Sequence, residues 1–260
     1  MDHSFWPRRG STGDRQSAPL NAIPPDRDER QVPSILSLAI SRPLEIDQMS
    51  KTTGLTLYLP VDRLILMTIN ETRTAVLDVA QEFLQTRGYN AFSFRDLADR
   101  VRIKSASIHY YFPTKRELCL ALVARQREQV ASALSAIDEA GLDAGEKLHR
   151  YAGIFQDTLA LENRMCLCGM LASDHATLDP EIVRNLRLAF DDHEVWLTRV
   201  LEEGRADGSS HFDGTASEEA RSLLSSLEGA MLLARAYEDP ARFEMTARRL
   251  LAKLRAIPNG

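Results

Sequence analysis

The sequence has few of the features that mark membrane, secreted or enzymatic proteins. Its 260 residues include three cysteines, spaced too irregularly for a disulfide framework, which favours the reducing cytoplasm. It has no run of 18 apolar residues and no secretory h-region, so we expect no membrane segment and no export signal. The motifs GxSxG, GxxxxGK[ST], HExxH and GxGxxG are missing, so we expect no enzyme, no metal and no cofactor.

Charge is unevenly distributed along the chain, although the net charge is only −5. Residues 71–127 contain ten basic and six acidic residues, a net charge of +4, whereas residues 128–260 have a net charge of −9. Residues 1–70 are neutral overall. A basic block joined to an acidic block indicates two tasks on one chain, one of which involves phosphates.

The N-terminal part is set apart by proline, because seven of the 11 prolines lie at or before Pro60. The first 50 residues show no sustained periodicity and are predicted to be disordered. Residues 55–66 are more apolar and are compatible with a short strand, a weak helix or untranslated upstream sequence. We therefore interpret residues 1–66 as a disordered leader or a mis-assigned start, with the natural start at Met67 or Met49.

From Ile69 onward apolar residues recur at helical spacing, which predicts an all-α fold of about nine helices. Residues typical of helix starts and helix ends divide this periodic pattern into segments. The expected helix starts and stops are Gly88, Ser93 with Asp96, Ser105, Thr114 with Glu117, Asp143, Asp179 with Pro180, Gly204 and Gly208, Thr215 or Ser217, and Asp239 with Pro240.

The basic block has the pattern of a helix-turn-helix over residues 93–113. A helix over 94–101 is followed by a three-residue turn and a second helix over 105–112, which Ile108 and Phe112 attach to the core. The side chains expected to point outward from this second helix are Ser105, Ser107, His109 and Tyr110. Nearby cations that can contact phosphates are Arg95, Arg102, Lys104 and Lys115.

Residues 72–118 resemble the DNA-binding domain of the tetracycline-repressor (TetR/AcrR) family, through the strings RTAVLDVAQEFLQTRGYNAFSFRDLADRV and IKSASIHYYFPTKREL. The resemblance implies a DNA-binding domain at 70–130 and an effector-binding and dimerisation domain at 131–260. It implies a homodimeric regulator, most simply a repressor, that binds a double-stranded pseudo-palindromic operator and responds to an unknown small-molecule effector. The rival interpretation is a helical interaction protein or enzyme that does not bind DNA.

Carried over by position, the family's DNA-reading residues are Ser105, Ala106, Ser107, His109 and Tyr110. Tyr111 and Lys115 fall where the family contacts phosphates. Two positions depart from the family pattern. Arg102 replaces the usual turn glycine, so we expect a turn that does not require a positive φ, and His109 replaces an aromatic residue, which leaves the base readout open.

Cys166 and Cys168 invite a metal interpretation that their spacing opposes, because positions i and i+2 of a helix point about 200° apart. One interpretation is that these thiols and Met170 are core or pocket-lining residues. The alternative is a redox or electrophile sensor, in which neighbouring Arg164 lowers a thiol pKa. Both alternatives remain open from the sequence.

The last two helices are candidates for a dimer interface, because in the resembled family the final pair packs against its mate as a four-helix bundle. Gly229 and its neighbours allow close approach of helices. The alternative is that these faces form only the core of a single chain. The residues assigned to the interface are Leu227, Ala230, Met231, Ala234, Leu250 and Leu254.

Overall fold

The computed structural model describes the backbone of residues 61–255 and the side chains of residues 70–255. Within this range the chain forms nine α-helices and two short 3-10 helices, so the predicted all-α fold is confirmed. The elements in chain order are α2 (Val61–Arg87), η1 (Tyr89–Ala91), α3 (Phe94–Val101), α4 (Ser105–Tyr111), α5 (Lys115–Glu139), α6 (Ala144–Ala160), α7 (Leu167–Ser173), η2 (His175–Thr177), α8 (Pro180–Asp207), α9 (Ala216–Ala236) and α10 (Pro240–Leu254). None of the described helices combines the length and the apolar character needed to cross a membrane.

The first described helix begins earlier than the sequence predicted. Helix α2 starts at Val61, ahead of Ile69, where the predicted helical pattern begins, so residues 61–66 are helical and Met67 lies inside the helix. The rest of the predicted leader, including Met49, lies outside the described residues.

Most predicted helix starts are confirmed by their hydrogen bonds. Ser93, Thr114, Asp143 and Thr215 each form a complete capping box with the acidic residue three positions later. Thr215 and not Ser217 is thus the cap of α9. The two Asp-Pro starts are also as predicted, with each aspartate side chain accepting a hydrogen bond from the backbone of the first turn.

Gly204 does not end α8, contrary to the prediction. The helix continues to Asp207 and stops at Gly208, whose φ is 81°. Gly204 serves a packing purpose, since a Cβ atom there would lie 2.7 Å from the Cβ of Ala144 and 2.4 Å from the Oγ of Ser210. The glycine therefore lets the loop after α8 and the start of α6 approach the helix closely.

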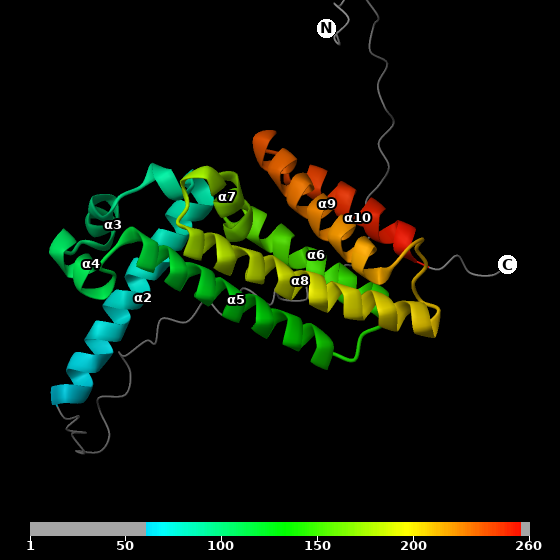
Figure 1. The fold of residues 1–260 in the computed structure, drawn as a ribbon, viewed down its shortest axis with the longest axis horizontal. Helices are drawn as coiled ribbons and strands as arrows, with labels where there is room; N and C mark the ends of the chain where they lie inside the picture. Colours follow the sequence, from blue (N-terminus) through cyan, green and yellow to red (C-terminus); the bar gives the residue numbers. More distant parts are fainter. Residues whose placement is uncertain (1–60, 256–260) are drawn as a thin grey trace, which may run out of the picture. The chain divides into compact units, whose positions relative to one another are not determined.

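Buried apolar side chains form two clusters. The first, here the N-terminal core, joins α2, α3, α4 and the first half of α5 to α7 and to residues 182–189 of α8. The second, the C-terminal core, joins the second half of α5 to α6, α9, α10 and the rest of α8. Helices α5 and α8 lie side by side and extend through both (Figure 1). Helix α5 passes from the N-terminal core at Val123 to the C-terminal core at Val130, and α7 packs with the N-terminal helices, so the domain boundary at 130/131 stays a prediction.

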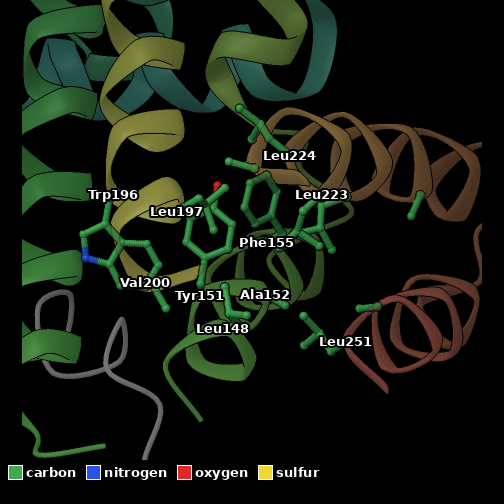
Figure 2. Close-up of a cluster of buried hydrophobic side chains, with 14 of the residues drawn as sticks. Leu148, Tyr151, Ala152, Phe155, Trp196, Leu197, Val200, Leu223, Leu224 and Leu251 are labelled. Atoms are coloured by element: carbon green, nitrogen blue, oxygen red, sulfur yellow. The ribbon is translucent and has the colours of Figure 1, made fainter. Parts of the chain in front are cut away.

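Aromatic rings dominate the centre of the C-terminal core. Tyr151 of α6 stacks on Trp196 of α8 with ring centroids 5.5 Å apart, and Phe155 stacks on Phe243 of α10 at 6.5 Å. Figure 2 shows Tyr151 and Phe155 between the leucines of α9 and the side of α8. Stacked rings of this size contribute both buried apolar area and favourable ring geometry, so they fix α6 against its neighbours.

Candidate nucleic-acid interface

The helix before the predicted reading helix is held at its first turn by a complete capping box. The backbone N–H of Ser93 donates to Asp96 at 2.7 Å, and the Asp96 N–H donates back to the Ser93 hydroxyl at 3.4 Å. The Ser93 hydroxyl also donates to the Asp96 carboxylate, at 2.6 Å, and this hydrogen bond, followed by that from the Ser93 N–H, lowers the pKa of Asp96. Leu97 and Ala98 then point into the N-terminal core, which fixes the orientation of α3.

The turn between α3 and α4 corrects the expectation for Arg102. This residue adopts the left-handed conformation, with φ 63° and ψ 43°, and its N–H donates to Ala98 to end α3. The turn thus keeps the geometry that a glycine would favour, and an arginine adopts it at a conformational cost of about 1–2 kcal/mol. The next residue, Ile103, packs against the N-terminal core and anchors the turn.

Helix α4 presents the predicted face to solvent. Ser105, Ala106 and His109 are exposed, Tyr110 is 72% exposed, and Ser107 is half-buried. Ile108 and Phe112 are buried beneath them, as predicted. Ser105 does not cap the helix, because Lys104 occupies the cap position and Ser105 is the first helical residue. Its hydroxyl is therefore not used in capping.

His109 is oriented by its neighbours. Its ring lies edge-on to Phe94 of α3, with centroids 4.8 Å apart, and its Nδ1 lies 3.2 Å from the carbonyl oxygen of Pro113. Tyr110 and Tyr111 also meet edge to face, at 5.2 Å. The side chains that the sequence assigns to base contacts thus lie on a helix whose aromatic members are held in place by ring contacts.

Lys115 was predicted to contact DNA phosphates, but its ammonium group forms contacts within the protein. Its Nζ donates to the carbonyl oxygens of Tyr89 and Phe92, each at 2.5 Å, and lies over both aromatic rings. Burial lowers the pKa of Lys115. The contacts tie the start of α5 to the loop that precedes α3. Arg95 in the first turn of α3 and Lys104 at the start of α4, in contrast, are exposed.

Cys166 and Cys168 are closer to each other than the helical spacing predicted. Cys166 precedes α7 in an extended conformation, with φ −50° and ψ 129°, so the i, i+2 argument does not apply to it. Its thiol contacts the thiol of Cys168 and the carboxyl group of Glu228. The hydrogen bond with Cys168, followed by burial, raises the pKa of Cys166. Arg164 pairs with Glu82 and Glu162 instead of a thiol. The expected lowering of a thiol pKa by Arg164 is therefore wrong.

Met170 lies between the two cores, packed against both. Its sulfur accepts a hydrogen bond from Arg235 at 3.4 Å. It is half-buried at the junction of α7 with α2 and α9, so its predicted place in an effector or sensor site stays a prediction.

The residues assigned to the dimer interface are mostly internal. Five of them have at most 7% of their surface exposed and belong to the C-terminal core, while Leu250 is half-buried against it. They are Leu227, Ala230, Met231, Ala234 and Leu254. The most apolar face of each amphipathic helix is filled by the chain's own helices, so a surface for another subunit has to use a neighbouring face.

Two residues that the sequence did not single out contact the helices before α3. Asp174, at the end of α7, accepts hydrogen bonds from the N–H of Tyr89 at 2.7 Å and from the Asn90 amide at 3.1 Å. Arg235, in the last turn of α9, donates to the carbonyl oxygens of Gln85 at 3.0 Å and Thr86 at 2.5 Å. Local sequence patterns could not predict the contacts of Asp174 or Arg235, because their partners are more than 80 residues away in the sequence.

Comparison with known proteins agrees with this geometry. The family model of bacterial regulatory proteins of the tetR family matches residues 76–122, from the middle of α2 to the start of α5. A curated relative, the HTH-type transcriptional repressor KstR2 of Rhodococcus jostii (strain RHA1), is 28% identical over 155 residues, which cover 54% of this chain and 69% of the relative.

Solved structures extend the match over nearly all the described helices. A TetR-family transcriptional regulator from Agrobacterium tumefaciens is 33% identical, with a TM-score of 0.70, over 72% of this chain and 100% of that one. A TetR transcriptional regulator from Legionella pneumophila is 35% identical, with a TM-score of 0.65, over 70% of this chain and 96% of that one. With its exposed α4 and its helical body, the chain belongs to the TetR family of bacterial DNA-binding transcriptional regulators.

Proposed function

We propose that the protein is a homodimeric repressor that binds a pseudo-palindromic operator through α4 and leaves it when a small-molecule effector binds. The observation that carries this proposal is the exposed face of α4, where Tyr110 projects into solvent above the buried Ile108. Repression, as opposed to activation, is supported by the relative from Rhodococcus jostii, which is a transcriptional repressor. As a regulator of transcription it would act in the cytoplasm.

The division of work within the interface follows from the chemistry of the side chains. Ser105, Ser107, His109 and Tyr110 would face base edges in the major groove, and Arg95 and Lys104 would contact phosphates. Two-fold symmetry places the two copies of α4 about 34–36 Å apart, which is one turn of DNA.

The dimer surface that we propose lies beside the predicted one, on the exposed stripe of α9 and α10. Leu232 and Leu233 of α9 are 56% and 58% exposed, and Met245 of α10 is 58% exposed. A Cβ atom on Gly229 would meet nothing within 4 Å, so another helix has room to approach there. Exposed apolar side chains gathered on two adjacent helices are typical of a subunit interface.

A small-molecule effector is favoured over a thiol switch by the state of the cysteines. Cys168 is buried, and the half-buried Cys166 has a raised thiol pKa, so little reactive thiolate is present at neutral pH. Helix α5 can transmit an effector signal, because it starts beside α4 and ends in the C-terminal core. The effector must bind the two conformations with different affinity.

The test is fluorescence anisotropy with the DNA upstream of the protein's own gene. We expect salt-dependent binding that Tyr110→Ala abolishes or weakens by at least about tenfold. Lys104→Ala should weaken binding and reduce the slope of log affinity against log salt by about 1. His211→Ala, at an exposed site in the loop between α8 and α9, is the control and should change nothing. If folded wild-type protein does not bind this DNA at any salt concentration, the rival interpretation of a protein without DNA binding is favoured.

A further inference from the structure

The C-terminal end of α2 is capped by a side chain that is distant in the sequence but adjacent in space. The last carbonyl groups of a helix have no partner within the helix. In α2, the carbonyl oxygen of Leu84 accepts from Gly88, whereas those of Gln85 and Thr86 accept from the guanidinium of Arg235. Arg235 lies in the last turn of α9, about 150 residues later in the chain. It therefore acts as a cap for α2 from a distant helix.

This cap suits both the charge and the geometry of the helix end. The C-terminus of a helix has a partial negative charge, which a cation stabilises. The planar fork of a guanidinium can donate to two neighbouring carbonyls at once, whereas a lysine ammonium acts as a single point charge. Arg235 is also half-buried, so the contact is less screened by water than a surface ion pair.

Helix α7 completes the same junction. The Gln85 side chain donates to the Met165 carbonyl at 3.0 Å, and the Met165 N–H donates to the Gln85 carbonyl at 3.1 Å. At the other end of α7, Asp174 holds the N–H of Tyr89. We call Gln85, Thr86, Met165, Asp174 and Arg235 the α2 junction.

The α2 junction leads directly to the predicted DNA-reading elements. Tyr89, which Asp174 holds by its N–H, is held at its carbonyl by Lys115, the first residue of α5. Lys115 also holds the carbonyl of Phe92, immediately before the cap residue of α3. A movement of α7 would thus reach the loop before α3 and the start of α5, the two segments that flank α3 and α4, through hydrogen bonds, and a movement of α9 would reach the end of α2.

Helices α7 and α9 also meet beside the α2 junction. A Cβ atom on Gly169 of α7 would lie 2.6 Å from an oxygen of Glu228, which lies two turns before Arg235 on α9. The carboxyl group of Glu228 therefore occupies the space next to Gly169, and a movement of α7 would have to displace it.

We propose that Arg235 is a positioning residue for operator binding. By capping α2 it fixes the distance and angle of α4 relative to the body that forms the dimer, and an effector that displaces α7 or α9 would weaken operator binding by breaking this contact. The inference rests on the proposed function. It adds a second connection between effector binding and operator binding, beside the one through α5. It requires that the junction differ between two conformations of the protein.

The experiment compares the full-length wild-type protein with Arg235→Ala, Arg235→Lys and Asp174→Ala on its operator. Arg205→Ala is the matched control, because Arg205 also donates to two carbonyl oxygens, those of Phe212 and Gly214, but at the opposite end of α8 from α7. Each variant is checked by circular dichroism and sedimentation before anisotropy titrations on the operator and on operators with one base pair inserted or removed at the centre.

We expect Arg235→Ala to fold and dimerise but to bind the operator about 5–150-fold more weakly, the usual range of a coupling between sites. Its preference for the natural half-site spacing should also be reduced, which a loss of stability alone would not produce. Arg235→Lys should be intermediate and Arg205→Ala unchanged.

Two outcomes overturn the inference while leaving the proposed function intact: wild-type affinity and spacing preference in Arg235→Ala, or equal losses in Arg205→Ala. If Arg235→Ala does not fold, the same comparison rests on Arg235→Lys and Asp174→Ala. If the wild-type protein itself binds no operator, the proposed function fails instead.

Discussion

The hydroxyl of Tyr151 lies 2.9 Å from Nδ1 of His193, and both side chains are buried in the C-terminal core. This hydrogen bond joins α6 to α8 at the centre of the aromatic cluster. A neutral imidazole can take part in it without cost, whereas a protonated one would be a charge enclosed among rings. Burial accordingly lowers the pKa of His193 to about 4.

Because the folded-state pKa of His193 is depressed, its contribution to stability is present above pH 6.5 and is lost as the pH falls toward about 4. A shift from 6.5 to about 4 corresponds to a loss of about 3 kcal/mol over this window. Urea unfolding gives the free energy of unfolding of the wild type and of His193→Asn at each pH. The difference between these two free energies should shrink as the pH falls. His211→Asn, an exposed control, should follow the wild type. Parallel pH profiles for wild type and His193→Asn would contradict the prediction.

Arg102 leads to a second prediction, because its left-handed conformation disfavours any residue with a Cβ atom. We expect Arg102→Gly to stabilise the protein by about 1 kcal/mol. Thermal unfolding followed by circular dichroism is the measurement. Arg95→Gly, in the right-handed first turn of α3, should act in the opposite direction. A destabilised Arg102→Gly protein would show that the arginine side chain supplies compensating contacts.

The local parts of the fold follow directly from the sequence. The capping boxes at Ser93 and Thr114 and the Asp-Pro starts involve residues two or three positions apart, so their hydrogen bonds are readable from spacing alone. The buried positions of α4, Ile108 and Phe112, follow from helical periodicity in the same way. These features are enough to identify the predicted DNA-reading face.

Features that depend on contacts between distant helices could not be predicted. Gly204 has the appearance of a helix stop, whereas its close approach to Ala144 and Ser210 shows that it is a packing glycine within α8. Leu227 and Met231 are apolar on a terminal helix, and the sequence does not say whether the same chain or another subunit covers them. The role of Arg235 is invisible for the same reason, since a basic residue in a last turn is unremarkable by itself.

The exposed stripe on α9 gives a third prediction. Leu233→Glu should convert the dimer to monomers, because it introduces a charge into an apolar subunit contact. Sedimentation equilibrium measures the change, and operator affinity should fall with it since two half-sites are no longer bound together. Leu188→Glu, at a 47% exposed leucine of α8, is the matched control. Dimers of Leu233→Glu with wild-type affinity would place the interface elsewhere.

Glu228 supplies the last prediction, because it is a carboxyl group enclosed between α7 and α9. Its Oε2 atom has no hydrogen-bond partner among the described residues. Burial, followed by the neighbouring Cys166 thiol, raises the pKa of Glu228 well above 4.5. The unfolded chain therefore releases this proton at lower pH than the folded protein does. Stability linked to Glu228 is complete below pH 4.5 and is lost as the pH rises through the folded-state pKa.

Replacing Glu228 with glutamine should remove this loss. We expect Glu228→Gln to be more stable than the wild type at pH 8, because there the folded wild type must keep this carboxyl protonated or bury its charge, and equal to it near pH 4, where both side chains are neutral. Urea unfolding at both pH values measures the difference, with Glu202→Gln on the exposed face of α8 as control. An advantage that is the same at pH 4 and pH 8 would mean that packing against Gly169, and not ionisation, sets the cost of this carboxyl group.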